Sequence, residues 1–136
     1  MIVDTSALVA ITRKERGFEP ILNALLSEAG LVPAPVLVEF ARVSALADSQ
    51  PDPLAVALLE EIVGADISIE EFTVDHADIA GRANGEYGTG NGRGGRLNLL
   101  DLMVYAVAKR TGRPILCTGR DFTATDAAIH AASRRD

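Results

Sequence analysis

Short apolar runs alternate with longer segments of helical periodicity along the whole chain. Four runs are predicted as strands, at residues 1–3, 31–32, 67–72 and 115–118. Between them, apolar residues recur three and four positions apart, which predicts amphipathic helices. The first expected helix begins after the capping residues Thr5–Ser6 and ends at Gly17. The others run from 21 to Gly30, from 36 to about 48, from 54 to 63, from the cap Asp75 to about 87, and from 99 to 110.

The order of these elements predicts the fold class. Strands separated by helices indicate a parallel sheet, because parallel neighbours need a crossover connection, and helices then cover both faces. We therefore expect an α/β fold with three layers around a central, mostly parallel sheet. The chain has 136 residues and shows no repeat or linker, so residues 1–136 are predicted to form a single domain.

Composition excludes several classes of protein. A single cysteine, Cys117, rules out a disulfide framework and a cysteine-based zinc site. No apolar run reaches the roughly 18 residues of a membrane span, and Met1–Asp4 lacks the basic start of a signal peptide. These features favour a protein of the reducing cytoplasm without a membrane partner.

The charge is acidic overall but unevenly distributed. The formal net charge is -6, which argues against a polyanion such as RNA as a partner. Residues 43–81, however, carry nine acids and no base, whereas residues 82–120 carry seven bases and two acids. A basic segment of this kind is a hint of a side that faces a polyanion, although both segments are also consistent with ordinary solvated surfaces.

Four acids stand close to the predicted strand ends or helix starts, where parallel α/β sheets place their sites. They are Asp4, Glu39, Asp101 and Asp121. Four convergent carboxylates repel one another unless a cation lies between them, and hard divalent ions prefer oxygen ligands. The sequence therefore predicts a site for Mg²⁺ or Mn²⁺.

Each acid also has an ordinary structural interpretation. Asp4 is suited to a turn, Asp101 to a capping box with Asn98, and Asp121 to the start of a short helix. Glu39 is less easily explained, since its neighbours on both sides are apolar. Only the four acids together favour the cation site over capping.

Four segments and Glu39 resemble a known family. The segments are Met-Ile-Val-Asp-Thr-Ser-Ala-Leu at 1–8, Asp-His-Ala-Asp at 75–78, Leu-Asn-Leu-Leu-Asp at 97–101 followed by Tyr-Ala-Val-Ala-Lys at 105–109, and Gly-Arg-Asp-Phe at 119–122 followed by Thr125–Asp126. Their order and spacing are similar to those of PIN domains, in particular the VapC toxin ribonucleases. The likeness runs from residue 1 to about 126.

This resemblance implies a PIN-type α/β/α sandwich and a metal-dependent endoribonuclease. It assigns the acidic quartet to Asp4, Glu39, Asp101 and Asp121, as catalytic residues and ligands of Mg²⁺. Supporting positions match Ser6, Asn98 and Asp126. It also implies an RNA substrate, a VapB-like antitoxin partner and a homodimer. The chain departs from the family pattern in residues 88–96, where relatives often carry a His-Pro-containing loop, at Leu100, and after Asp126.

The glycine-rich segment 85–95 and the apolar helices suggest further contacts. Arg93 and Arg96 are candidates for binding RNA phosphates, with an ordinary flexible loop as the alternative. The apolar faces at 36–46 and 54–63 are candidates for a dimer face or an antitoxin groove, unless core packing uses them fully. For the whole protein we therefore predict a VapC-type toxin. The alternatives are a non-catalytic α/β module that binds proteins, and a PIN nuclease of RNA maturation.

Overall fold

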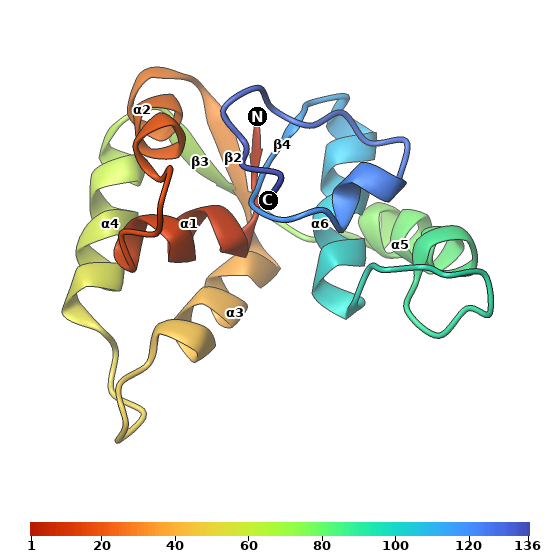
Figure 1. Cartoon of the computed structure of the whole chain (residues 1–136), viewed down its shortest axis with the longest axis horizontal. Coiled ribbons are helices and arrows are strands. Elements are labelled where there is room, and N and C mark those ends of the chain that lie inside the picture. The colour runs from red at the N-terminus through yellow and green to blue at the C-terminus, as the bar shows by residue number, and fades with distance from the viewer.

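The computed structural model describes all 136 residues, as six α-helices, four β-strands and one 3₁₀ helix (Figure 1). None of the helices is long and apolar enough to span a membrane. In chain order the elements are β1 (Ile2–Val3), α1 (Thr5–Thr12), α2 (Glu19–Ser27), β2 (Gly30–Pro33), α3 (Ala34–Ser44), α4 (Pro53–Gly64), β3 (Ile67–Glu70), α5 (Val74–Tyr87), α6 (Leu99–Thr111), β4 (Ile115–Leu116) and the 3₁₀ helix η1 (Phe122–Ala124).

The four strands form one sheet in the order β3-β2-β1-β4, and every pair is parallel. Ile2 in the centre pairs with Leu31 on one side and Ile115 on the other. Figure 1 shows α1, α2 and α4 on one side of the sheet and α5 and α6 on the other. The predicted parallel sheet with helices on both faces is confirmed.

The core explains why the central strands are continuous apolar runs. Both residues of β1 and both residues of β4 are fully buried, because helices cover the two faces of the sheet. The most buried helix residues, among them Leu8, Phe40 and Val107, pack into the same cluster. Cys117 belongs to this cluster and is 2% exposed, as expected of a small core residue.

Local hydrogen bonds set helix boundaries that differ from the expected ones. Asp4, rather than Thr5–Ser6, caps α1, and its carboxylate accepts a hydrogen bond from the Ser6 amide. Thr73, rather than Asp75, caps α5, in a capping box with the buried His76 ring. Helix α3 ends at Ser44 instead of about residue 48.

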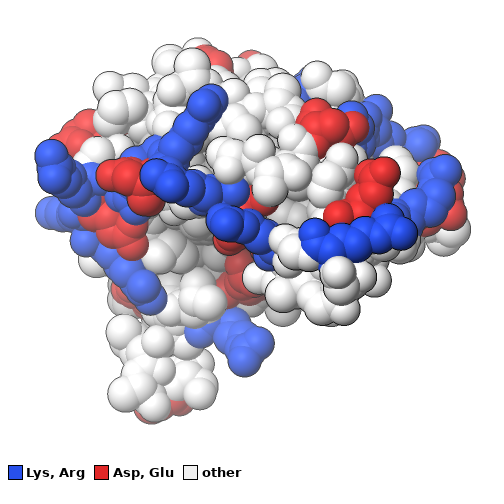
Figure 2. Space-filling model, turned by 45° about the vertical axis from the view of Figure 1, so that its right-hand side comes forward, with Lys and Arg blue, Asp and Glu red and all other residues white.

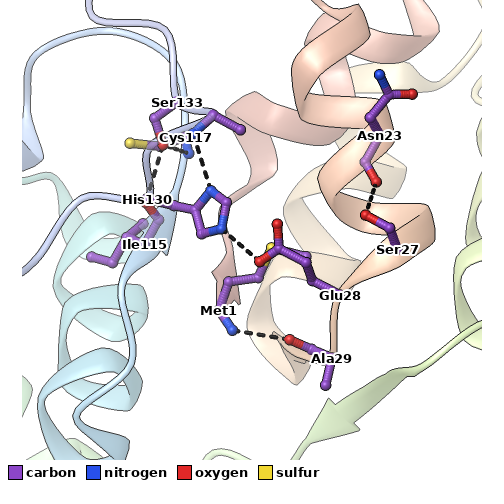
Figure 3. Close-up of polar contacts among 10 residues, drawn as sticks. Met1, Asn23, Ser27, Glu28, Ala29, Ile115, Cys117, His130 and Ser133 are labelled. Carbon is purple, nitrogen blue, oxygen red and sulfur yellow. Dashed lines mark hydrogen bonds and ion pairs between the residues drawn. The ribbon is translucent and has the colours of Figure 1, made fainter.

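The residues after Asp126, where the sequence departs from the family pattern, follow a defined course along the sheet. Ile129 forms a parallel bridge to Ile115, and Arg134 forms another to Thr118, so the chain end lies along the outer edge of β4. Figure 3 shows Ser133 between the backbone of Ile115 and Cys117, and the His130 ring beside the Glu28 carboxylate. The distance between His130 Nε2 and Glu28 Oε2 is 2.9 Å. We call residues 129–136 the C-terminal arm.

Candidate active site

Parallel pairing brings the carboxyl ends of the strands to one edge of the sheet. Asp4 directly follows β1, Glu39 lies in the helix that follows β2, and Asp121 comes five residues after β4. The first turn of α6 adds Asp101 at the same edge. All four acids line a single cavity of about 320 Å³. The tertiary structure thus brings together the four acids that the sequence singled out.

Asp4 is the most buried of the four acids, at 5% exposed. Its Oδ2 accepts hydrogen bonds from the amide and the hydroxyl of Ser6. The Ser6 Oγ in turn accepts a hydrogen bond of 2.9 Å from the Thr118 amide, which follows β4. Burial raises the pKa of Asp4, and the nearby charge of Glu39 adds to this, while the Ser6 hydrogen bonds oppose it. The Ser6 contacts therefore fix Asp4 in place and occupy one of its two oxygens.

Asp101 combines a structural role with a place in the cavity. Its Oδ2 accepts from the Asn98 amide at 3.0 Å, and its own amide donates to the Asn98 side chain at 2.8 Å, which closes a capping box. Desolvation raises the pKa of Asp101 to about 7, and the charges of Asp4, Asp121 and Glu39 contribute to the rise. The capping interpretation is correct, but it does not exclude the cation site, because the carboxylate has a second oxygen.

Glu39 and Asp121 complete the ring of acids from opposite sides. Glu39 is half-buried on α3, and it also borders a second, larger hollow of about 920 Å³ between α3 and the start of α6. Asp121 is exposed at the start of η1, and its side chain makes no capping hydrogen bond. Capping therefore does not account for Asp121.

The comparison with family models agrees with this arrangement. The model described as "PIN domain" matches residues 1–128. The chain belongs to the PIN-domain family. The match includes every residue that lines the acidic cavity, all four acids among them, and it ends just before the C-terminal arm.

Sequence relatives place this PIN domain among the VapC ribonucleases of toxin–antitoxin systems. It is 40% identical to "Ribonuclease VapC42" of Mycobacterium tuberculosis, over 93% of this chain and 95% of the relative. It is 36% identical to "Ribonuclease VapC36" of the same species, over 93% of this chain and 90% of the relative. A third relative, "VapC ribonuclease R02377" of Rhizobium meliloti, is 33% identical over 91% and 96% of the two chains.

Solved structures share the fold at low sequence identity. The structure of Mycobacterium tuberculosis VapC20, described as a "Sarcin-Ricin loop cleaving toxin", matches with a TM-score of 0.71 at 19% identity, over 93% of this chain and 95% of that one. A "Toxin-antitoxin complex from Klebsiella pneumoniae" matches with a TM-score of 0.69 at 18% identity, over 95% of both chains. These likenesses support the PIN fold.

Two of the three expected supporting residues of the PIN site lie at the quartet. Ser6 contacts Asp4, and Asn98 contacts Asp101. Asp126 lies elsewhere, since its carboxylate accepts from the Tyr105 hydroxyl at 2.6 Å and pairs with Lys109 at 2.9 Å. These two contacts lower the pKa of Asp126 and give it a structural role in tying the chain after η1 to α6.

The arginines expected to bind RNA are not at the acidic cavity. Arg93 lines a different hollow, between α5 and α6, and Arg96 does not line the cavity. The loop that carries them is closed by its own hydrogen bonds, as when the Asn91 side chain accepts from the amides of Arg93 and Gly95. The cavity wall instead includes Arg13 and Glu15, which sequence reasoning missed. The signal for them was the run Arg-Lys-Glu-Arg directly after the first helix.

The donor set of the cavity suits a hard divalent ion. As the side chains stand, no group of three or more His, Cys, Asp or Glu residues is arranged to hold a metal ion. The four acids nevertheless share one cavity, and their mutual repulsion is part of the raised pKa of Asp101. Both Ser6 hydrogen bonds to Asp4 end on Oδ2, which leaves Oδ1 to face an ion. All-oxygen ligands of this kind fit Mg²⁺ or Mn²⁺ and do not fit a thiolate-bound metal.

Proposed function

We propose that this chain is the toxin of a type II toxin–antitoxin pair, a Mg²⁺-dependent endoribonuclease that hydrolyses RNA phosphodiester bonds. One observation supports the proposal above all others. Four carboxylates from four separate parts of the chain line one cavity, and the pKa values of Asp4 and Asp101 are raised there. Clustered acids with raised pKa values in a cleft are typical of catalytic sites.

The residues have separate tasks in this proposal. Asp4 and Asp101 each keep one oxygen free of the contacts that orient them, and these two oxygens would hold the ion. Glu39 and Asp121 would complete its surroundings, by direct contact or through water. When bound, Mg²⁺ supplies Lewis acidity, which lowers the pKa of water and offsets charge on the phosphate. Mn²⁺ is expected to substitute for it.

Ser6 and Asn98 act in this proposal by holding the two central acids rigidly. The Ser6 hydroxyl joins the start of α1 to Thr118, two residues beyond β4, through its contacts with Asp4 and the Thr118 amide. The Asn98 capping box fixes the Asp101 side chain to the end of a buried helix. Carboxylates held in this way need little reorganisation when charge develops on the substrate.

Metal removal tests the proposed activity directly. The purified protein is expected to cleave unstructured single-stranded RNA when Mg²⁺ or Mn²⁺ is present, and to stop when a chelator is added. Restoring excess Mg²⁺ is expected to restore cleavage. Cleavage that continues in chelator would show that the acids do not work through a cation, and no cleavage under any condition would favour a non-catalytic binding module.

Ser6→Ala is expected to reduce the rate of RNA cleavage by about 10- to 100-fold, the usual effect of losing a group that orients a metal ligand. The substitution leaves the Thr118 amide without its acceptor and removes one of two donors to Asp4. Ser27→Ala provides a matched control, because Ser27 bonds only the Asn23 carbonyl of its own helix (Figure 3). Equal rates for the two variants would contradict the positioning role of Ser6.

We further propose that a VapB-like antitoxin binds this chain and that the chain forms a homodimer. Solved neighbours include toxin–antitoxin complexes, among them VapBC2 from Rickettsia felis, with a TM-score of 0.68 and 16% identity. The apolar residues of α3 and α4 are only partly buried in the core, since Val38 is 72% exposed and Leu54 is 66% exposed. Exposed apolar faces of this kind fit protein partners.

A further inference from the structure

Two basic segments lie beside the acidic cavity, one of them the turn after α1. This turn, residues 13–17, contains Arg13, Lys14 and Arg16, all of them exposed. Arg13 lines the acidic cavity itself, so the turn stands at its mouth. Arg13 also donates a hydrogen bond to the Val43 carbonyl of α3, which holds the turn against the helix that carries Glu39. The turn therefore places Arg13 in the wall of the acidic cavity, with Lys14 and Arg16 following it within three residues along the chain.

The second basic segment comes from the other end of the chain. Arg120 adjoins Asp121 of the cavity, and its Nε donates to the Arg135 carbonyl at 2.9 Å. Arg134 joins the C-terminal arm to the turn after α1, since its guanidinium donates to the Arg16 carbonyl at 2.6 Å and to the Glu15 carboxylate at 2.8 Å. Glu15 also lines the cavity. The arm and the turn thus form one continuous surface.

Arg134 forms ion pairs with the acids of this surface, and the other basic residues of the surface have no carboxylate partner. Its two ion-pair partners, Glu15 and Asp136, are the acids that flank the basic residues of the turn and the arm. No ion pair involves the remaining basic residues, which are Arg13, Lys14, Arg16, Arg120 and Arg135. Figure 2 shows basic side chains gathered around a hollow in which acidic side chains are visible.

We propose that the turn and the C-terminal arm form the track that holds the phosphates of the RNA strand as it enters the acidic cavity. The inference rests on the proposed function and names the part of the protein that binds its substrate. Unpaired arginines and lysines beside a site for phosphodiester chemistry supply sequence-independent affinity for the RNA backbone. The track also explains how an acidic protein binds RNA, because its cations lie beside the site while nine of the 19 acids lie in residues 43–81.

The track is tested with two variants that lose the same number of positive charges, one within the track and one elsewhere on the surface. The first variant combines Lys14→Gln, Arg16→Gln and Arg135→Gln, whose side chains make no hydrogen bond or ion pair within the protein. The control variant combines substitutions of three other exposed arginines, which do not line the cavity and make at most an exposed ion pair: Arg82→Gln, Arg110→Gln and Arg113→Gln. Both variants lose three positive charges. The probe is a short, fluorescein-labelled, unstructured RNA.

The track variant is expected to bind this RNA about 10- to 100-fold more weakly at low salt, measured by fluorescence anisotropy. The slope of log affinity against log salt is expected to fall by about 2, which corresponds to the loss of three phosphate contacts on a single strand. KM for cleavage is expected to rise by a similar factor while kcat changes less than about threefold, because the acids are untouched. The control variant is expected to stay within about threefold of wild type in all three measurements.

The possible results separate the track from the proposed function. Equal losses in both variants would show that only net charge matters, and a loss in the control alone would place RNA along α5 and α6; either result overturns the track. Unchanged RNA binding and an unchanged KM in the track variant would overturn the track as well. RNA binding that depends on the track, without any Mg²⁺-dependent cleavage, would support the track and contradict the proposed function.

Discussion

Asp101→Asn is expected to lower the rate of RNA cleavage by about 10²–10³-fold or more, the scale of losing one charge-stabilising group at a reacting centre. The substitution removes the charge that would hold the ion but keeps the shape of the side chain. Asn still accepts from the Asn98 amide, so the capping box and the start of α6 are preserved. The loss should therefore appear in cleavage assays, while circular dichroism and the thermal midpoint show a folded protein.

Asp126→Asn is the matched control for this prediction. It is the same chemical change at an acid that also belongs to the family resemblance, but Asp126 pairs with Tyr105 and Lys109 and does not line the cavity. Cleavage by Asp126→Asn should stay within about threefold of wild type, with a stability loss of about 1 kcal/mol or less. Similar cleavage rates for the two variants would contradict the assignment of the quartet.

The metal-free protein is expected to lose stability as the pH rises from about 4 to about 7. The pKa of Asp101 is raised to about 7 by desolvation and by the neighbouring acids, so the folded state binds its proton more tightly than the unfolded chain does. The stability that this proton confers is fully present below pH about 4 and is lost as the pH approaches 7. Because Asp101 is partly exposed, we expect a change of about 1–2 kcal/mol after solvent screening. Urea titrations across this range measure it.

Added Mg²⁺ should reverse this loss at high pH. At a concentration about 100 times its Kd, a ligand that binds only the folded state adds roughly 2.7 kcal/mol to the free energy of unfolding. The gain should be large at pH 8, where the acids are ionised, and small at pH 5, where protons compete with the ion. In Asp101→Asn both the pH dependence and the Mg²⁺ effect should shrink. An equal Mg²⁺ effect at the two pH values would indicate binding away from the cavity.

Local patterns predicted the elements of this fold because the relevant interactions are short in sequence. The strands β1 and β4 are apolar runs because helices cover both faces of the sheet. The helical spacing of residues 99–110 arises because the helix buries one face. Errors arose where one side chain decided a boundary. Asp4 and Thr73 cap helices whose caps we expected one or two residues later, because several nearby residues have equally suitable side chains.

The candidate site was predictable to the extent that topology places strand ends together. Asp4, Glu39, Asp101 and Asp121 follow from that rule and from the family resemblance, and they share a cavity. Asp126 has a similar sequence context and lies elsewhere, since its direction depends on Tyr105 and Lys109 on a different element. Arg93 and Arg96 likewise are separated from the cavity, which nothing in their local sequence indicated.

The sequence by itself determined the order of strands and helices, the parallel sheet and the four acids, because periodicity, helix breakers and chain connectivity act locally or through general rules of topology. Only the tertiary structure decided which residues that are far apart in the sequence contact one another. Arg134 contacts Glu15 across 119 residues, and Thr118 contacts Ser6 across 112. Such contacts depend on the path of the C-terminal arm along β4, which is set by backbone pairing that any sequence can make. For that reason the basic surface beside the cavity emerged only from the folded chain.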